Sequence, residues 1–308
     1  MASTSAPRSR ELVATTTLIA VTAIWGSTFI VVKDAVQQMP ALDFLFWRFL
    51  IATLVVGPLR PRACKNLGAR GLRRGAAIGL VLGAGYVLQT VGLEHTPATV
   101  SGFITGLFVV FTPLCAGVLL RRRVPNLAWL GVGLATIGLA LIALRGWQIG
   151  AGEWLTLGCA FMFALQIIGL GEWAPHHDPA ALAIVQLGVT TLICLVGAAP
   201  ASLAPPPTAK VWAAVGLTSI AATALAFVVQ TWAQSILNPT RAAIVLTSEP
   251  VFAAIFGVAV GGEPFGFRTA IGALCVLGAM LLVELPPGDS DRRGPAAAET
   301  EPTNRALH

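Results

Sequence analysis

The chain has 308 residues, of which 56% are hydrophobic and only 11% are charged, and its formal net charge is +6. An average soluble domain contains about 25% charged residues, so this composition is too poor in charge to cover a folded surface in water. It excludes a soluble globular protein, a coiled coil and a disordered chain, and it indicates that most of the chain lies in lipid.

The charged residues divide the chain into uncharged stretches that suit membrane-crossing helices, each of which needs roughly 20 mostly apolar residues. We expect ten transmembrane helices, in the segments 11–33, 42–59, 74–94, 94–121, 123–145, 153–172, 178–210, 210–241, 240–261 and 267–283. The apolar run of the first segment is too long for a cleaved signal peptide, so we expect it to be retained. Residues 286–308 are rich in Pro, Asp, Glu and Ala and are expected to form a disordered cytoplasmic tail.

Lys and Arg residues indicate the orientation of the helices. Ten crossings place both termini on one side, and a cytoplasmic N-terminus puts 15 of the 20 Lys and Arg in cytoplasmic segments. Because cytoplasmic loops collect Lys and Arg, we predict that both termini are cytoplasmic. These basic residues are spread over separate short loops, which argues against binding to nucleic acid.

A weak internal repeat divides the chain in two. The stretch Thr99–Leu141 aligns with Thr240–Leu282 without a gap, and the alignment pairs Val110 with Val251 and Gly131 with Gly272. Five helices in each half is an odd number, so the second half must be inverted. We therefore expect an all-α integral membrane protein built as a 5+5 inverted repeat, with a cytoplasmic tail at 1–11 and repeats at 12–144 and 152–285. Such repeats are common in transporters, whose site lies at the repeat interface.

Three motifs in the chain resemble those of the EamA-type family in the drug/metabolite transporter superfamily. They are Trp25-Gly26-Ser27-Thr28-Phe29 before Lys33, Phe46-Trp47-Arg48-Phe49 before Ala52, and the run from Pro239 through Ser248-Glu249-Pro250 to Gly262-Glu263-Pro264. The resemblance covers about residues 12–285 and implies ten helices in a 5+5 inverted repeat that moves small metabolites. In one departure, Arg121-Arg122-Arg123 occupies the place of a Gly-Glu pair in the first repeat.

Glu249 is the strongest candidate for a functional residue. Seven residues separate it from Arg241 and thirteen from Glu263, so a spanning helix must hold it inside the membrane. A carboxyl group there is costly and is a functional candidate by default, and the adjacent Pro250 breaks the helix hydrogen bonding. Glu249 is expected either to couple protons or contact substrate, or to bond a neighbouring helix in its neutral form and hold a kink.

Arg48 is the second candidate, about two turns from the outer end of its helix by our count. Its side chain is expected either to extend to the outer interface or to anchor a substrate carboxylate or an intramembrane acid. Single polar or aromatic residues in other spans are expected to face the interior, because polar groups are expensive in lipid. Those chosen as substrate or coupling candidates are Trp25, Ser27, Tyr86, Gln89, Gln166 and Gln230, and Pro113 joins Pro250 as an expected helix break.

Glycines at four-residue spacing are expected to let helices approach closely. These are Gly75/Gly79/Gly83, Gly102/Gly106 and Gly257/Gly261. The five cysteines contain no CxxC pair, and the loop sequence His176-His177-Asp178 is expected to be solvated rather than to bind metal. No P-loop or other nucleotide motif is present, so we expect no cofactor and no direct use of ATP.

These features favour a secondary transporter in a bacterial cytoplasmic membrane. The expected solute is a small organic metabolite, such as an amino acid or an amphipathic compound, moved by alternating access, and family resemblance favours export. Proton coupling through Glu249 and uncoupled exchange are both compatible with one intramembrane acid. The alternatives are a facilitator or channel, a receptor or structural membrane protein, and a membrane-embedded enzyme. The enzyme is disfavoured because the spans offer one carboxylate and no histidine.

Overall fold

The computed structural model describes residues 8–59, 63–121, 126–143, 149–201, 203–237, 242, 245–246 and 248–284. Each of the ten expected segments contains a described helix. The described helices in chain order are α1 (Arg8–Val36), α2 (Ala41–Val56), α3 (Ala63–Asn66), which lies outside the ten segments, α4 (Gly68–His95), α5 (Ala98–Gly106), α6 (Phe108–Leu119), α7 (Asn126–Ala143), α8 (Ala151–Trp173), α9 (Pro179–Ala198), α10 (Ala209–Ser219), the π-helix η4 (Ile220–Leu225), α11 (Ala226–Ile236), α13 (Glu249–Ala259) and α14 (Phe267–Glu284). The expected C-terminal tail lies outside the described residues.

Six stretches within the described ranges are helical, long and apolar enough to cross a membrane. They are Ser9–Val36, Gly68–His95, Ala98–Leu119, Ala151–His176, Pro179–Ala198 and Ala209–Ile236. Large apolar side chains also lie on the outer surface, and Phe267 and Val118 are 84% and 80% exposed. An apolar surface of this kind suits contact with lipid rather than water.

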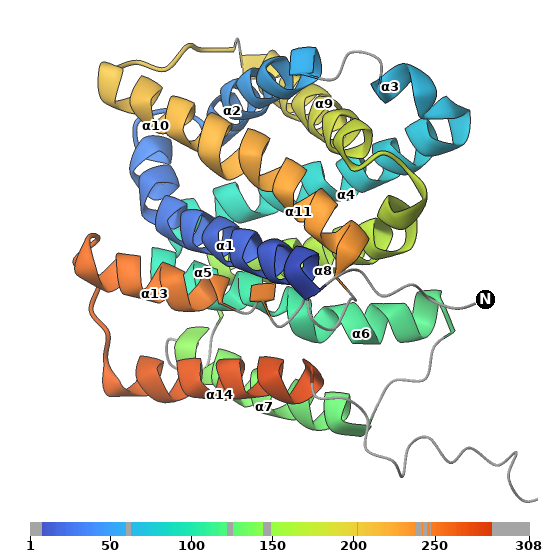
Figure 1. The fold of residues 1–308 in the computed structure, drawn as a ribbon. Helices are drawn as coiled ribbons and strands as arrows, with labels where there is room; N and C mark the ends of the chain where they lie inside the picture. Colours follow the sequence, from blue (N-terminus) through green and yellow to red (C-terminus); the bar gives the residue numbers. More distant parts are fainter. Residues whose placement is uncertain are drawn as a thin grey trace, which may run out of the picture.

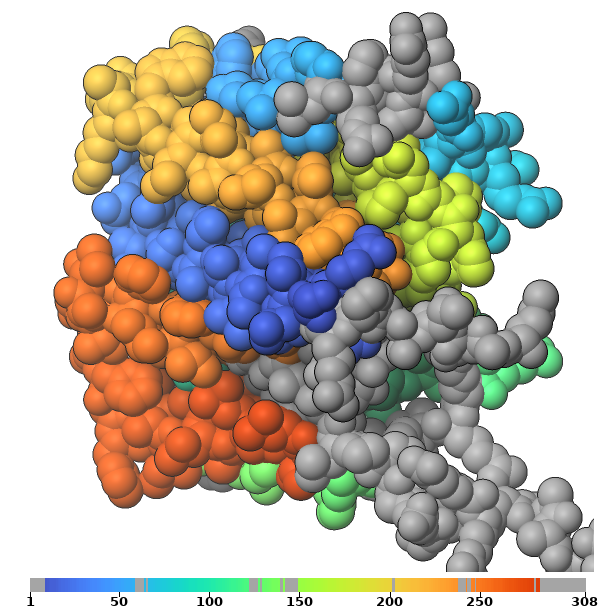
Figure 2. All heavy atoms as spheres, viewed as in Figure 1, coloured from blue at the N-terminus to red at the C-terminus, as the bar shows by residue number. Residues whose placement is uncertain are grey.

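The helices form a layered bundle in which distant parts of the sequence lie together (Figure 1). Helix α1 packs against both α13 and α11, and α4 packs against both α8 and α9. Helices α7 and α14 pack along each other at the lower edge of the bundle in Figure 1. The space-filling view shows α14, in red, along that edge, separated from α1 by α13 (Figure 2). The central helices α1, α2, α4, α8 and α11 surround the site described below.

Local sequence signals set several helix boundaries. The Asp178 side chain accepts a hydrogen bond from Ala181 N at the start of α9. The Thr208 hydroxyl accepts one from Val211 N at the start of α10. Both are N-caps, which satisfy amide groups that have no partner inside the helix. Helix α10 continues through η4 into α11, so a wide π turn lies in the middle of one long helix. Such π segments often mark functional sites.

The predicted packing role is confirmed for the glycines of α4 and for Gly102. A Cβ atom added to Gly75, Gly79 or Gly83 would lie within 2.8 Å of atoms in α9. The same test at Gly102 brings the added atom within 2.5 Å of Ala253 in α13. Small residues therefore hold α4 against α9 and α5 against α13 at distances that larger side chains would prevent.

Candidate functional site

A cavity of about 50 Å³ lies inside the bundle between helices from both halves of the chain. Residues from α1, α2, α4 and α6 meet residues from α8, α11 and the start of α13 around it. The lining side chains are Trp25, Thr28, Phe29, Val32, Arg48, Leu82, Tyr86, Gln89, Thr90, Leu93, Phe108, Phe163, Gln166, Ile167, Phe227, Gln230, Leu246 and Glu249. In this conformation the cavity is smaller than the roughly 300–1,000 Å³ of sites that bind drug-sized ligands.

Arg48 lies on the wall of this cavity and is only 3% exposed. Its Nε donates a 2.7 Å hydrogen bond to Thr223 Oγ1 in the π-helix η4, and its guanidinium carbon lies 4.9 Å from the centre of the Tyr86 ring. The expectation that Arg48 extends to the outer interface is therefore wrong. A hydroxyl acceptor and an aromatic face in the interior provide the contacts that a buried guanidinium requires.

Aromatic rings from four helices form the apolar part of the wall. Tyr86 of α4 lies 5.3 Å from Phe163 of α8 and 6.0 Å from Phe227 of α11, between ring centres. Trp25 of α1 lies 5.6 Å from Phe227, and its Nε1 donates a 2.8 Å hydrogen bond to the carbonyl oxygen of Ala222 in η4. With its polar N–H group satisfied there, the face of the indole can contact an apolar ligand.

Glu249 lines the same cavity at the first residue of α13 and is 6% exposed. Pro250 follows it in the first turn of the helix, where the missing N–H group costs nothing. Glu249 thus lies where a helix begins inside the bundle. The cavity therefore has a guanidinium and a carboxyl group within an otherwise largely apolar wall.

Buried amides extend the polar part of the site. Gln166 Nε2 donates to Gln186 Oε1 over 3.3 Å, and Gln186 Nε2 donates to Thr231 Oγ1 over 3.2 Å. Gln230 also lines the cavity, and its Oε1 has no hydrogen-bond partner among the described residues. Gln89 Nε2 donates to Thr105 Oγ1 over 3.2 Å. These amides provide both donors and acceptors near the cavity.

The structure brings most of the predicted site residues together. Trp25, Tyr86, Gln89, Gln166 and Gln230 line the cavity, as do Arg48 and Glu249. Ser27 is not among the lining residues, and its hydroxyl donates to Ile24 O in its own helix. Pro113 also lies outside the lining set, and α6 continues past it to Leu119, so the expected helix break at Pro113 is not seen.

Sequence reasoning missed two groups of site residues. One is Thr223 with Ala222, whose π-helical backbone carries no recognisable sequence signal. The other is Phe163 and Phe227, which are hard to distinguish from ordinary core residues in so apolar a chain. Among the described residues, no group of three or more His, Cys, Asp or Glu side chains could hold a metal ion.

Comparison with known proteins identifies the family. The model of the EamA-like transporter family matches residues 13–144 and again 150–285. The chain belongs to the EamA-like transporter family. This confirms the resemblance found in the sequence, and it makes the chain a multi-pass membrane protein with two copies of the EamA domain.

Relatives of this EamA-like transporter occur in archaea and bacteria. An uncharacterized transporter of Archaeoglobus fulgidus is 32% identical over 90% of this chain and 87% of its own length. The uncharacterized inner membrane transporter YedA of Escherichia coli K12 is 26% identical over 87% of this chain and 89% of its own. The uncharacterized transporter YetK of Bacillus subtilis is 27% identical, over 94% and 92% respectively.

A crystal structure of a protein 18% identical in sequence matches the fold of this EamA-like transporter. The match covers 87% of this chain and 95% of the other, with a TM-score of 0.63. At this identity the likeness concerns the fold alone.

Proposed function

We propose that this EamA-like transporter is a secondary transporter that exports small organic solutes through the cavity around Arg48 and Glu249. The solute is a compound such as an amino acid or an amphipathic molecule, and it moves by alternating access between two inverted five-helix halves. The observation that carries the proposal is a largely apolar cavity, lined by both halves, that holds one buried cation and one buried carboxyl group.

Three features support this function. Residues of the two EamA matches face one another across the cavity, as expected when a site lies at a repeat interface. The aromatic wall suits an apolar body, and Arg48, Glu249 and the glutamines suit a polar head group. The distribution of Lys and Arg favours ten crossings of a bacterial cytoplasmic membrane, with both termini on its cytoplasmic side.

Solute counterflow in proteoliposomes tests the proposed function. Purified protein is reconstituted with a high internal concentration of unlabelled solute, and entry of the labelled solute is followed for a panel of amino acids and amphipathic amines. Transient accumulation of at least one solute, absent from protein-free vesicles, is the expected result. No accumulation across the panel would overturn the proposal, while a flux that never accumulates would favour a channel.

Glu249→Gln tests the role of the carboxyl group in coupling. The amide keeps the size of the side chain but cannot release a proton, so proton-driven accumulation is expected to fall about tenfold or more, on the scale of general acid–base groups. Counterflow, which needs no proton gradient, is expected to continue. Normal proton-driven transport by the variant would eliminate this role and favour uncoupled exchange.

A further inference from the structure

The Glu263 carboxylate makes a bidentate contact with the start of α5. The contact lies at the end of the bundle where α1, α4 and α13 end. Glu263 Oε1 accepts a 2.6 Å hydrogen bond from Ala98 N, and its Oε2 accepts a 2.8 Å bond from Thr99 N. These are the first two amides of α5. A carboxylate at a helix N-terminus gains from both the free N–H groups and the helix dipole. Glu263 therefore joins the chain after α13 directly to α5.

The backbone before Glu263 aims its side chain at α5. Gly262 has φ of +62°, a left-handed conformation that reverses the chain after the helix and that other residues adopt at a cost. Glu263 N then donates a 3.1 Å hydrogen bond to Gly257 O in the last turns of α13. The Gly262-Glu263 pair thus both ends α13 and directs the carboxylate to the neighbouring helix.

The two helices joined by Glu263 are in close contact. A Cβ atom added to Gly257 would overlap Thr99 Oγ1 and would lie 3.1 Å from Glu263 Oε2. At the same corner, Lys33 Nζ near the end of α1 donates a 2.7 Å bond to Thr96 O. We call these contacts of Lys33, Thr96, Ala98, Thr99 and Glu263 the Glu263 clasp. They connect α1, the α4–α5 corner and the end of α13.

The clasp lies beyond one end of the cavity. Val32 of α1 and Leu93 of α4 line the cavity, and each is within three residues of a residue in the clasp, Lys33 and Thr96. Both are at most 5% exposed, so the cavity has no wide opening beside them. Helices α5 and α13 both pack against α1, which carries Val32, and α5 also packs against α4, which carries Leu93. Separating α5 from α13 would therefore change the packing of the two helices that line this end.

The first half of the chain has no equivalent carboxylate in sequence. In the register that pairs Thr99 with Thr240, the partner of Glu263 is Arg122. A guanidinium has no acceptor for backbone N–H groups, so it cannot replace the carboxylate in such a contact. The two ends of the molecule are therefore chemically unequal.

We propose that Glu263 is a positioning residue that holds the outer end of the cavity closed, and that its bonds to α5 break when the transporter opens outward. This inference rests on the proposed function and its topology, which put residues 262–266 outside. Because the first half carries Arg122 at the matching position, closure of the outer end is favoured over closure of the inner end. The clasp thereby biases the resting transporter toward outer closure.

Thiol labelling of Val32→Cys, in a chain whose five native cysteines are replaced, tests the proposal without measuring transport. A membrane-impermeant maleimide is added to intact cells, and the labelling rate is compared with and without Glu263→Gln. The amide side chain has only one acceptor oxygen, so one strong hydrogen bond is lost. We expect the labelling rate to rise about tenfold, because the free energy of one charge-assisted hydrogen bond shifts a two-state equilibrium by about that factor.

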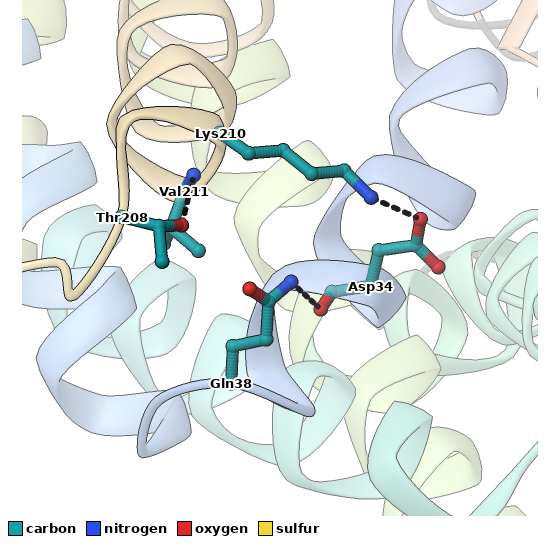
Figure 3. A network of polar contacts seen from close by, with 5 residues as sticks. All are labelled: Asp34, Gln38, Thr208, Lys210 and Val211. Carbon is teal, nitrogen blue, oxygen red and sulfur yellow. Dashed lines mark hydrogen bonds and ion pairs between the residues drawn. The ribbon is translucent and has the colours of Figure 1, made fainter.

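Lys210→Gln is the matched control at the same end of the bundle. Lys210 of α10 faces Asp34 of α1 over 3.7 Å (Figure 3), and the two side chains are 75% and 53% exposed. An exposed pair of this kind contributes little to stability. We therefore expect Lys210→Gln to leave labelling of Val32→Cys unchanged.

A second reporter separates opening from general loosening. In the same cysteine-replaced background, Leu187→Cys lies in α9, where the side chain is fully buried and does not line the cavity, and Glu263→Gln should not raise its labelling. Equal labelling of Val32→Cys with and without Glu263→Gln, in protein shown to be inserted in the membrane, would overturn the proposal. A parallel rise in the labelling of Leu187→Cys would also overturn it. If no solute accumulates in the counterflow assay but Glu263→Gln still raises labelling at position 32 alone, the proposed function is rejected and the role of the Glu263 clasp stands.

Discussion

At the scale of single residues, two buried polar side chains of the site depend on one or two specific partners. Arg48 has Thr223 and the Tyr86 ring, and Trp25 has the Ala222 carbonyl. Two of these three partners come from the π-helix η4. That short segment therefore positions two residues of the cavity wall, Arg48 of α2 and Trp25 of α1.

Thr223→Val should destabilise the protein by removing the hydroxyl that accepts from Arg48. Leaving a buried donor without its partner costs about 1–3 kcal/mol, so the unfolding midpoint in detergent is expected to fall by several degrees. Thr218→Val is the control, because the Thr218 hydroxyl bonds to Ala214 O in its own helix. Equal midpoints for the two variants would show that the Arg48 contact contributes nothing.

At the scale of elements, small residues decide which helices can be neighbours. Gly79 of α4 lies so near α9 that an added Cβ would be 2.8 Å from both Gln186 O and Val189 Cβ. Thr190 adds a 3.2 Å bond from its hydroxyl to Gly79 O. Because backbone atoms lie on both sides of this contact, it cannot adjust by a change of side-chain rotamer.

Gly79→Ala should therefore force α4 and α9 apart. Overpacking of this kind costs about 1–3 kcal/mol, which a lower unfolding midpoint in detergent would report. Gly216→Ala in α10 is the matched control, since no atom lies within 4 Å of the added methyl group. There the gain in helix propensity, about 1 kcal/mol, should stabilise the protein. A Gly79→Ala variant as stable as the parent would contradict the contact.

At the scale of the whole molecule, the cavity exists because two halves of the chain face each other. Helices α1, α2 and α4 belong to the first EamA match, and α8, α11 and α13 belong to the second. Inversion of one half relative to the other follows from the proposed topology, in which connections alternate between the two sides of the membrane.

That topology predicts which connections can be reached from each side. His176 and Ala199 are exposed and lie at opposite ends of α9. A cysteine at position 199 should react with an impermeant thiol reagent in intact cells, and one at position 176 only in inverted vesicles. With cytoplasmic termini the ratio of the two rates should exceed about tenfold, since the reagent cannot cross the hydrocarbon core. The reverse pattern would reject the orientation.

The sequence alone predicted the helical membrane class, the family, the ten helical segments and most of the polar residues of the cavity. These follow from the cost of placing charged or unpaired polar groups in lipid, which leaves a visible pattern along the chain. The glycine stripe of α4 was also predicted, because close helix packing requires small residues at a regular spacing.

Only the tertiary structure decided which partners the buried groups have. Arg48 could equally extend outward by sequence, and Thr223 became its acceptor because η4 turns its hydroxyl toward α2. Glu263 showed its role only when its carboxylate was found on the amides of Ala98 and Thr99, more than 160 residues away along the chain. Pairing between distant segments depends on three-dimensional packing, and residue spacing within one helix contains no information about it.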